Sequence, residues 1–188
     1  NCTIRLLGSD AINFIEDCCK NENFKNVILR IGSEKFMKKY DQELVLRFFA
    51  IKNDLESYKY PVTEYLTRYL EKMTTGSIEF DYTCERDIFD RTFDFINQQL
   101  GEEAFSGKTP AGTLKNEFVL YYYDGITVPV ALLIDDIRRF GDDTRIKQKI
   151  EEVKFGDELK TYKTGSVSGV RKRIELFTRG VQDLIDGR

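Results

Sequence analysis

The sequence predicts an all-α protein, an irregular multi-helix bundle. Apolar residues recur at the three- and four-residue spacing of a helix face along most of the chain. No stretch alternates apolar and polar residues as a half-buried strand does, and no repeat of fixed period is present. The expected helices are long and the loops between them are short, which favours helices packed on helices.

Size and charge restrict the possible functions. The 188 residues are 41% hydrophobic and include 14 phenylalanines, enough to bury a substantial core. We expect one helical domain over 1–188, with a main bundle at 1–155 and a basic loop and C-terminal helix at 156–188. The net charge of −3, from 29 basic and 32 acidic residues, gives no global attraction to nucleic acid or to an anionic membrane. Any such contact must come from a local patch.

The first two helices are expected at 9–20 and 24–31. Ser9 or Asp10 can cap the first, and Gly32 ends the second.

The cysteines predict a reduced, cytoplasmic protein. They include no C-x-x-C pair, and the chain has no histidine to complete a zinc site. Cys18 and Cys19 close the first helix, where we expect them to pack as small apolar side chains rather than to form a disulfide. No apolar run is long enough for a membrane span, and no signal peptide is expected.

The helix expected at 41–52 organises the rest of the chain. Apolar residues fall on all its sides except at Arg47, which is typical of a buried central helix. Asp41 is expected as the N-cap, with Glu43 in the first turn. A buried arginine needs a carboxylate partner, and Glu43, four residues earlier, lies on the same face. We therefore expect Arg47 to be paired within the core.

Two well-marked helices follow. Pro61 is placed like a first-turn proline, apolar residues follow it at helical spacing, and Gly76 ends the helix. A long helix is expected over 81–100, with an apolar inner face and with Gly101 at its end. The segment 107–112 is expected to be a loop.

The third quarter of the chain is harder to interpret. Segment 114–123 is expected to be a helix, although 118–123 has strand-like propensity, and Asp124-Gly125 is expected to end it. A buried helix should follow at 128–140, with Pro129 in its first turn.

The last two helices have clearer signals. Asp142-Asp143 can cap a helix whose apolar face holds Ile146, Ile150 and Val153. A final helix is expected from near Ser168 to Ile185.

The 41–52 helix also carries a sequence signature. Asp41-x-Glu43-Leu44-x-Leu46-Arg47-Phe48 resembles the D-x-E-L-x-L-R-F signature of GmrSD-type restriction proteins. The similarity runs from about Asn23 to Glu175. It includes Tyr65-Leu66-x-x-Tyr69-Leu70, Leu100-Gly101-x-x-Ala104-Phe105 and Ser166-Val167-Ser168-Gly169-Val170-Arg171-Lys172-Arg173-Ile174-Glu175.

The resemblance implies a fragment of a larger protein. In that family the signature follows a ParB-like nucleotide-hydrolysing domain with a D-G-Q-Q-R motif, and many members continue into an HNH nuclease domain. This chain has neither motif, and it opens on Asn1 rather than methionine. The implied function is that of a non-catalytic helical part of a restriction or anti-phage protein. Its partner would be the missing N-terminal ParB-like domain, and it could assist DNA binding.

The residues themselves argue against catalysis. The absence of histidine excludes an HNH nuclease, a Ser-His-Asp triad, a histidine-ligated metal and a HEPN-type ribonuclease site. Gly107-Lys108-Thr109 resembles the end of a Walker A loop. However, Glu102 stands where that motif needs glycine, and Pro110 blocks the helix that must follow. We predict a surface loop there, and no catalytic residue, metal site or cofactor.

One acidic spacing resembles that of metal-dependent nucleases. Asp136 followed by Glu152-x-Lys154 matches their two carboxylates and lysine. Those residues normally lie on a β-hairpin, whereas both segments here are expected to be helices. We therefore interpret them as helix ends and solvated faces.

A basic cluster near the C-terminus is the candidate phosphate-binding site. No acidic residue occurs between Leu159 and Ile174. The loop at 164–169 leads into a helix N-terminus and could present backbone N–H groups to phosphate. A solvated helix start is the simpler interpretation. The basic residues are Lys160, Lys163, Arg171, Lys172 and Arg173.

Two other functions are compatible with the sequence. The chain could be an unrelated all-α protein–protein interaction domain, with Tyr121-Tyr122-Tyr123 as its binding surface. An enzyme in its own right would rest on the acidic-lysine spacing alone.

Overall fold

The computed structural model describes residues 9–32 and 39–187. Most of these residues are helical, and no strand longer than an isolated bridge between Lys108 and Leu114 occurs among them. The prediction of an all-α, irregular multi-helix bundle is therefore confirmed.

The described elements differ in length from 3 to 19 residues. In chain order they are α2 (Ser9–Cys18), α3 (Glu22–Val27), α5 (Tyr40–Asp54), the 3-10 turn η1 (Leu55–Ser57), α6 (Val62–Thr75), α7 (Tyr82–Leu100), the 3-10 turn η2 (Gly101–Glu103), α8 (Leu120–Leu132), α9 (Ile134–Phe140), α10 (Asp143–Phe155), α11 (Asp157–Lys160) and α12 (Val167–Ile185).

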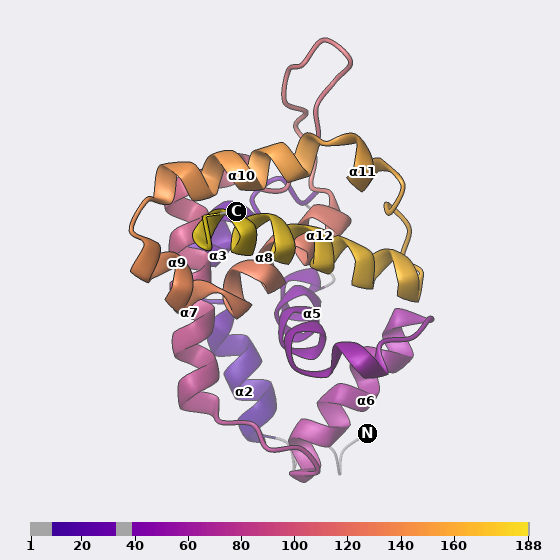
Figure 1. The fold of residues 1–188 in the computed structure, drawn as a ribbon. Helices are drawn as coiled ribbons and strands as arrows, with labels where there is room; N and C mark the ends of the chain where they lie inside the picture. The colour runs from indigo at the N-terminus through magenta and orange to yellow at the C-terminus, as the bar shows by residue number, and fades with distance from the viewer. Residues whose placement is uncertain (1–8, 33–38, 188) are drawn as a thin grey trace.

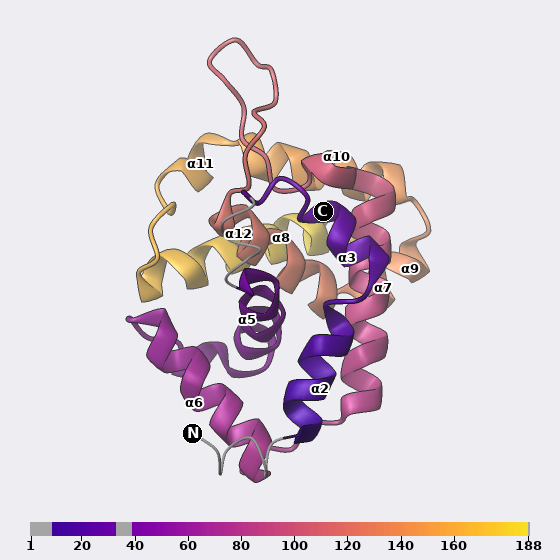
Figure 2. The same cartoon turned by 180° about the vertical axis from the view of Figure 1, so that it is seen from behind.

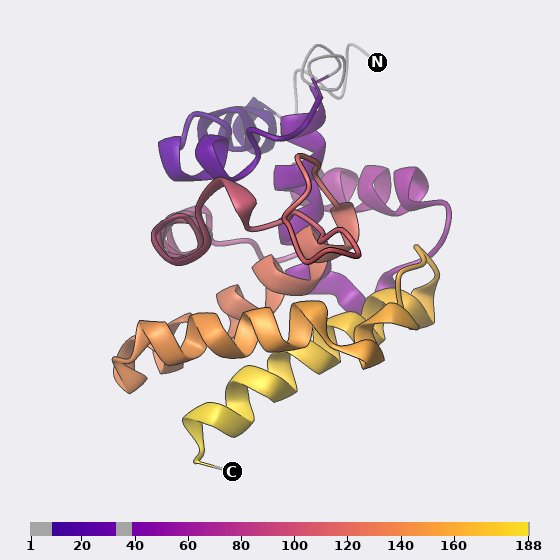
Figure 3. The same ribbon diagram turned by 90° about the horizontal axis from the view of Figure 1, so that it is seen from above.

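Helices α5 and α8 form the centre of the bundle. Helix α5 contacts α2, α6 and α8, while α8 contacts α5, α7 and α12 (Figure 1). On the opposite side α2 and α3 lie along α7 (Figure 2). Helices α10 and α12 lie side by side over α8, as the view from above shows (Figure 3).

Phenylalanine rings fill the core between α3, α5 and α7. The ring centroid of Phe48 lies 5.0 Å from that of Phe49 and 5.4 Å from that of Phe89. Phe93 continues the cluster, 4.5 Å from Phe89 and 5.0 Å from Phe24. These tilted and edge-on contacts add specific attraction to the burial of apolar area.

Several predicted helix ends are confirmed. Gly76 and Gly101 cap α6 and α7, and the Asp81 and Asp142 side chains accept N–H bonds at the starts of α7 and α10. Ser166 caps α12 in the same way.

Two predicted starts are wrong. Asp41 is not an N-cap, because α5 begins at Tyr40 after Lys39, whose backbone is left-handed with φ 57°. Asp41 and Glu43 both lie in the first turn. Helix α3 begins earlier than predicted, because the Asn21 side chain accepts the Phe24 N–H at 2.9 Å and caps the helix. It ends at Val27 with Ile28 as its C-cap, so Gly32 does not end it as predicted.

The largest error concerns 114–140. Residues 114–119 are not helical. The Val119 N–H donates to the Phe105 carbonyl across the loop at 2.9 Å, and not to a carbonyl one helical turn before it. The strand-like propensity of 118–123 does not produce a strand, since 120–123 form the first turn of α8. Asp124 and Gly125 do not end a helix but lie inside α8, as does Pro129, and the helix expected at 128–140 is divided between α8 and α9.

Candidate functional site

A buried ion pair joins the two central helices. The Arg47 Nε and Nη2 atoms of α5 donate to the two carboxylate oxygens of Asp124 of α8, each at 2.6 Å. The two side chains are 4% and 1% exposed. The expectation that Arg47 is paired within the core is confirmed. Its partner is Asp124 and not Glu43, which is exposed.

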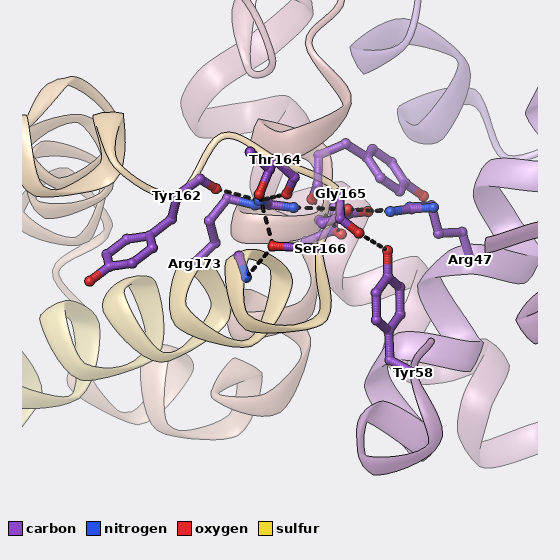
Figure 4. A network of polar contacts seen from close by, with 11 residues as sticks. Arg47, Tyr58, Tyr162, Thr164, Gly165, Ser166 and Arg173 are labelled. Carbon is purple, nitrogen blue, oxygen red and sulfur yellow. Dashed lines mark hydrogen bonds and ion pairs between the residues drawn. The ribbon is translucent and has the colours of Figure 1, made fainter. Parts of the chain in front are cut away.

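A second arginine approaches the same carboxylate. Arg173 of α12 is 2% exposed, and its Nη2 lies 3.7 Å from Asp124 Oδ2. Its Nη1 donates to the carbonyls of Tyr162 and Thr164, the latter at 2.7 Å. The guanidiniums of Arg47 and Arg173 thus share one carboxylate, and two backbone carbonyls accept from Arg173 Nη1, while the buried Arg173 Nε has no hydrogen-bond partner among the described residues (Figure 4).

The shared carboxylate affects the two arginines differently. Burial alone would lower the pKa of Arg47, but the charge and hydrogen bonds of Asp124 outweigh it and raise that pKa. Burial lowers the pKa of Arg173, with the charge of Asp124 opposing and that of Arg47 adding to the shift. Both guanidiniums remain charged, because arginine is not deprotonated in proteins. The centre of the bundle therefore holds two positive charges and one negative charge.

The network also fixes the segment that precedes α12. Tyr58 Oη donates to the Gly165 carbonyl at 3.1 Å, and Arg171 Nη2 donates to the Glu56 carbonyl at 2.8 Å. The segment at 162–166 is thereby held by three hydrogen-bonding groups: Tyr58, which follows η1, Arg173, and the Ser166 N-cap of α12 (Figure 4).

The structure does not bring the five predicted basic residues together on one surface. Arg173 is buried in the central network. Arg171 and Lys172 pair with Glu56 and Glu175 at 3.1 and 2.8 Å. Lys160 pairs with Asp157 beside it.

Lys163 is exposed, with its Nζ 5.9 Å from the Tyr121 ring. Ser166 of the predicted phosphate loop caps α12 by accepting the Gly169 N–H at 3.1 Å. Of the five, Lys160, Lys163 and Lys172 are exposed, and Lys172 does not line the cleft that Lys160 and Lys163 share.

The nuclease-like spacing falls on helices, as predicted. Asp136 pairs with Arg139 on α9, and Glu152 pairs with Lys149 on α10 at 2.6 Å. No group of acidic, cysteine or histidine side chains among the described residues could hold a metal ion. The segment 107–109 lies in a loop, as predicted.

Lys154 is a buried charge that the sequence pattern did not indicate. It is 4% exposed, and its Nζ donates to the carbonyls of Glu103 and Ala104 at 3.1 and 2.8 Å. Burial lowers the pKa of Lys154 to about 8; the charge of Glu151 opposes this shift and that of Lys108 adds to it.

Lys154 should make stability depend on pH. Above pH 8 Lys154 loses its proton in the folded protein, whereas in the unfolded chain it keeps the proton up to the ordinary lysine pKa of 10.5. The unfolded state therefore binds more protons over this range, and the free energy of unfolding should rise between pH 8 and 10.5. The gain is at most about 3 kcal/mol. It should be measured by urea denaturation as the difference between wild type and Lys154→Met, so that other titrations cancel. An equal pH dependence of both proteins would show that Lys154 keeps an ordinary pKa.

Two further sequence interpretations have clear outcomes. The prediction that Tyr121-Tyr122-Tyr123 form a binding surface is wrong for two of the three rings: Tyr122 and Tyr123 are 6% and 0% exposed and belong to the core, because α8 is covered by α12 and α7. Tyr121 is half-buried against the same core. Cys18 and Cys19 are free, as expected, and burial raises the pKa of each thiol to about 12. Cys2 lies outside the described residues.

An apolar groove of about 350 Å³ lies between α2, α5 and α6. The signature helix contributes Glu43 and Leu46 to it, while Leu44, Arg47 and Phe48 of the same signature are buried in the core. The apolar lining is Ile12, Ile15, Leu46, Leu66 and Leu70.

Comparison of the chain with protein-family models, curated proteins and solved structures finds no match. The resemblance to GmrSD-type proteins therefore remains a prediction. Among the described helices none has both the length and the apolar character that a membrane crossing requires.

Proposed function

We propose that the chain is a non-catalytic helical module of a GmrSD-like restriction or defence protein. It packs on a ParB-like nucleotide-hydrolysing domain of the same protein and assists the binding of DNA. The observation that carries the packing role is the apolar groove between α2, α5 and α6. A concave apolar surface of this kind is typical of a protein-binding site.

The signature residues support this assignment because they serve two surfaces of one helix. Leu44 and Phe48 anchor α5 in the core, whereas Leu46 and Glu43 line the groove. A helix held by a buried ion pair on one side gives a rigid wall for a partner on the other. An unrelated all-α interaction domain would use the same groove, and the upstream coding sequence separates the two alternatives. It should encode a D-G-Q-Q-R motif if the chain is GmrSD-like.

The packing role is tested by weakening the groove without touching the core. Leu46→Gln with Leu70→Gln should reduce affinity for the upstream domain, supplied as a separate protein, by about tenfold or more, because polar side chains lose the benefit of apolar burial. Titration calorimetry measures this. The matched control is Leu29→Gln with Leu132→Gln, at side chains 55% and 52% exposed elsewhere. Equal affinities for the two double variants would contradict the assignment of the groove.

The DNA role is tested by titrating a DNA duplex at two salt concentrations, with nucleotide hydrolysis assayed in the same samples. We expect salt-sensitive binding without hydrolysis, because phosphate contacts by lysine release counterions. Lys163→Glu with Lys172→Glu should abolish it. Arg173 is unsuitable for this test because its substitution would disturb the buried network. Hydrolysis or DNA cleavage by the chain alone would contradict the proposal.

A further inference from the structure

A lysine-rich cleft lies where the 107–115 loop meets the end of α10 and the start of α11. The loop projects beyond the helices at the junction of α10 and α11 (Figure 1), and the cleft encloses about 530 Å³. Its lining includes lysines from three segments and no aspartate or glutamate. These lysines are Lys108, Lys115, Lys154, Lys160 and Lys163.

Three of these lysines form no ion pair with any described residue: Lys108, Lys154 and Lys163. Glu103 and Glu151, however, line an adjoining pocket together with Lys108 and Lys154. Lys115 has Glu117 at 3.7 Å, and Lys160 has Asp157, but both pairs are exposed and therefore weak.

Two of the ammonium groups contact the same aromatic ring. Lys108 Nζ lies 3.8 Å from the centre of the Phe155 ring, and Lys154 Nζ lies 5.0 Å from the same ring. Lys154 is fixed by its two backbone acceptors, so the cleft has a positive group at a defined place. The charge of Lys108 lowers the pKa of Lys154, so the two ammonium groups repel each other, and an anion bound in the cleft would reduce this repulsion.

We propose that this lysine cleft binds a ligand that carries two or more linked phosphate groups. Several ammonium groups on different walls match several charges on one ligand, whereas a single carboxylate would leave most of them unpaired. The lining has lysine and no arginine. Lysine binds phosphate as a point charge, while planar carboxylates are the typical partners of arginine. The volume lies in the range of small-molecule sites.

The binding test uses inorganic tripolyphosphate as the probe, by titration calorimetry at about 0.1 M ionic strength, where distant surface charges are screened. Wild type should bind it, and Lys108→Met with Lys163→Met should weaken binding by about tenfold or more, because two of the charges that line the cleft are removed. The matched control is Lys20→Met with Lys72→Met, which removes the same charge outside the cleft. No binding by wild type, or equal weakening by both double variants, would overturn the proposal.

A second measurement tests whether the ligand binds near Lys154. A phosphate near Lys154 should stabilise its ammonium form, so binding at pH 8 should take up protons in wild type and less in Lys154→Met. The other charges that act on Lys154 are those of Lys108, Glu103, Glu151 and Arg30. Calorimetry in two buffers of different ionisation enthalpy measures the uptake. Equal uptake by the two proteins would place the ligand away from Lys154 and overturn the proposed site.

Competition identifies the source of the phosphates. If a DNA duplex displaces tripolyphosphate from wild type, the cleft takes the backbone of a nucleic acid; if it does not, the cleft takes a small polyphosphate ligand. Either result supports the proposal that the cleft binds linked phosphate groups. The site and the proposed packing role fail independently, because Leu46 and Leu70 line the groove and none of the five lysines does.

Discussion

Asp124→Asn should lower the free energy of unfolding by about 4 kcal/mol, because it leaves two buried guanidiniums without their counter-charge. Asparagine keeps the shape of the side chain, so the loss reports on charge and on the two hydrogen bonds from Arg47 rather than on a cavity. Natural domains have only about 5–15 kcal/mol of stability in total. The effect should be read from urea denaturation followed by far-UV circular dichroism.

A compensating variant keeps this prediction testable even if Asp124→Asn does not fold. Arg47→Met with Asp124→Leu leaves one buried guanidinium, that of Arg173, without a counter-charge, whereas Asp124→Asn leaves two, so the double variant should be the more stable of the two. Asp136→Asn is the matched control: its pair with Arg139 is exposed, and its loss should cost less than about 0.5 kcal/mol. A double variant no more stable than Asp124→Asn would mean that the ion pair is not what Asp124 contributes.

The need for this pair was predictable, but the partner was not. An arginine within an apolar helix requires a carboxylate wherever the chain folds, and this rule led to the correct expectation for Arg47. Asp124 lies 77 residues away along the chain, beside a glycine that suggested a turn. Local spacing favoured Glu43 instead. Only tertiary packing decides between a carboxylate in the same helix and one that another helix brings in.

The candidate sites show the same limit. The sequence indicated Lys160 and Lys163 as basic, but their neighbours in the cleft, Lys108 and Lys115, come from a loop some fifty residues earlier. Lys154 lies in the last turn of a regular amphipathic helix, where lysine normally suits the helix dipole and is exposed. The signal that could have revealed it is its position four residues after Ile150 and eight after Ile146, which places it on the buried face of the helix.

Helix assignment succeeded where chemistry marks the ends and failed where packing overrides it. The cap residues at Asp81, Asp142 and Gly76 act locally, so they can be recognised in the sequence. Asp124-Gly125 has the local chemistry of a break, yet α8 continues through both residues. The helix is stabilised there by the Arg47 pair and by the close approach of α12.

Gly125→Leu should therefore destabilise the protein by more than about 3 kcal/mol, because it overpacks the contact between α8 and α12. A Cβ atom at Gly125 would lie 2.9 Å from Cε2 and 3.1 Å from Cδ2 of Phe177. Phe177 is 1% exposed and cannot turn outward. Gly125→Ala should cost less, since the better helix propensity of alanine, about 1 kcal/mol, opposes the clash.

Rescue distinguishes this clash from a general effect on α8. Gly125→Leu combined with Phe177→Ala provides space for the new side chain, so its loss should be smaller than the sum of the two single losses. The control is Gly165→Ala, where a Cβ would meet no atom within 4 Å. Thermal and urea denaturation measure all four variants. Additive losses of stability in the double variant would show that Gly125 is needed for the backbone of α8 itself. Strong non-additivity would instead identify the close approach of α12 as the reason that a glycine lies in the middle of this helix.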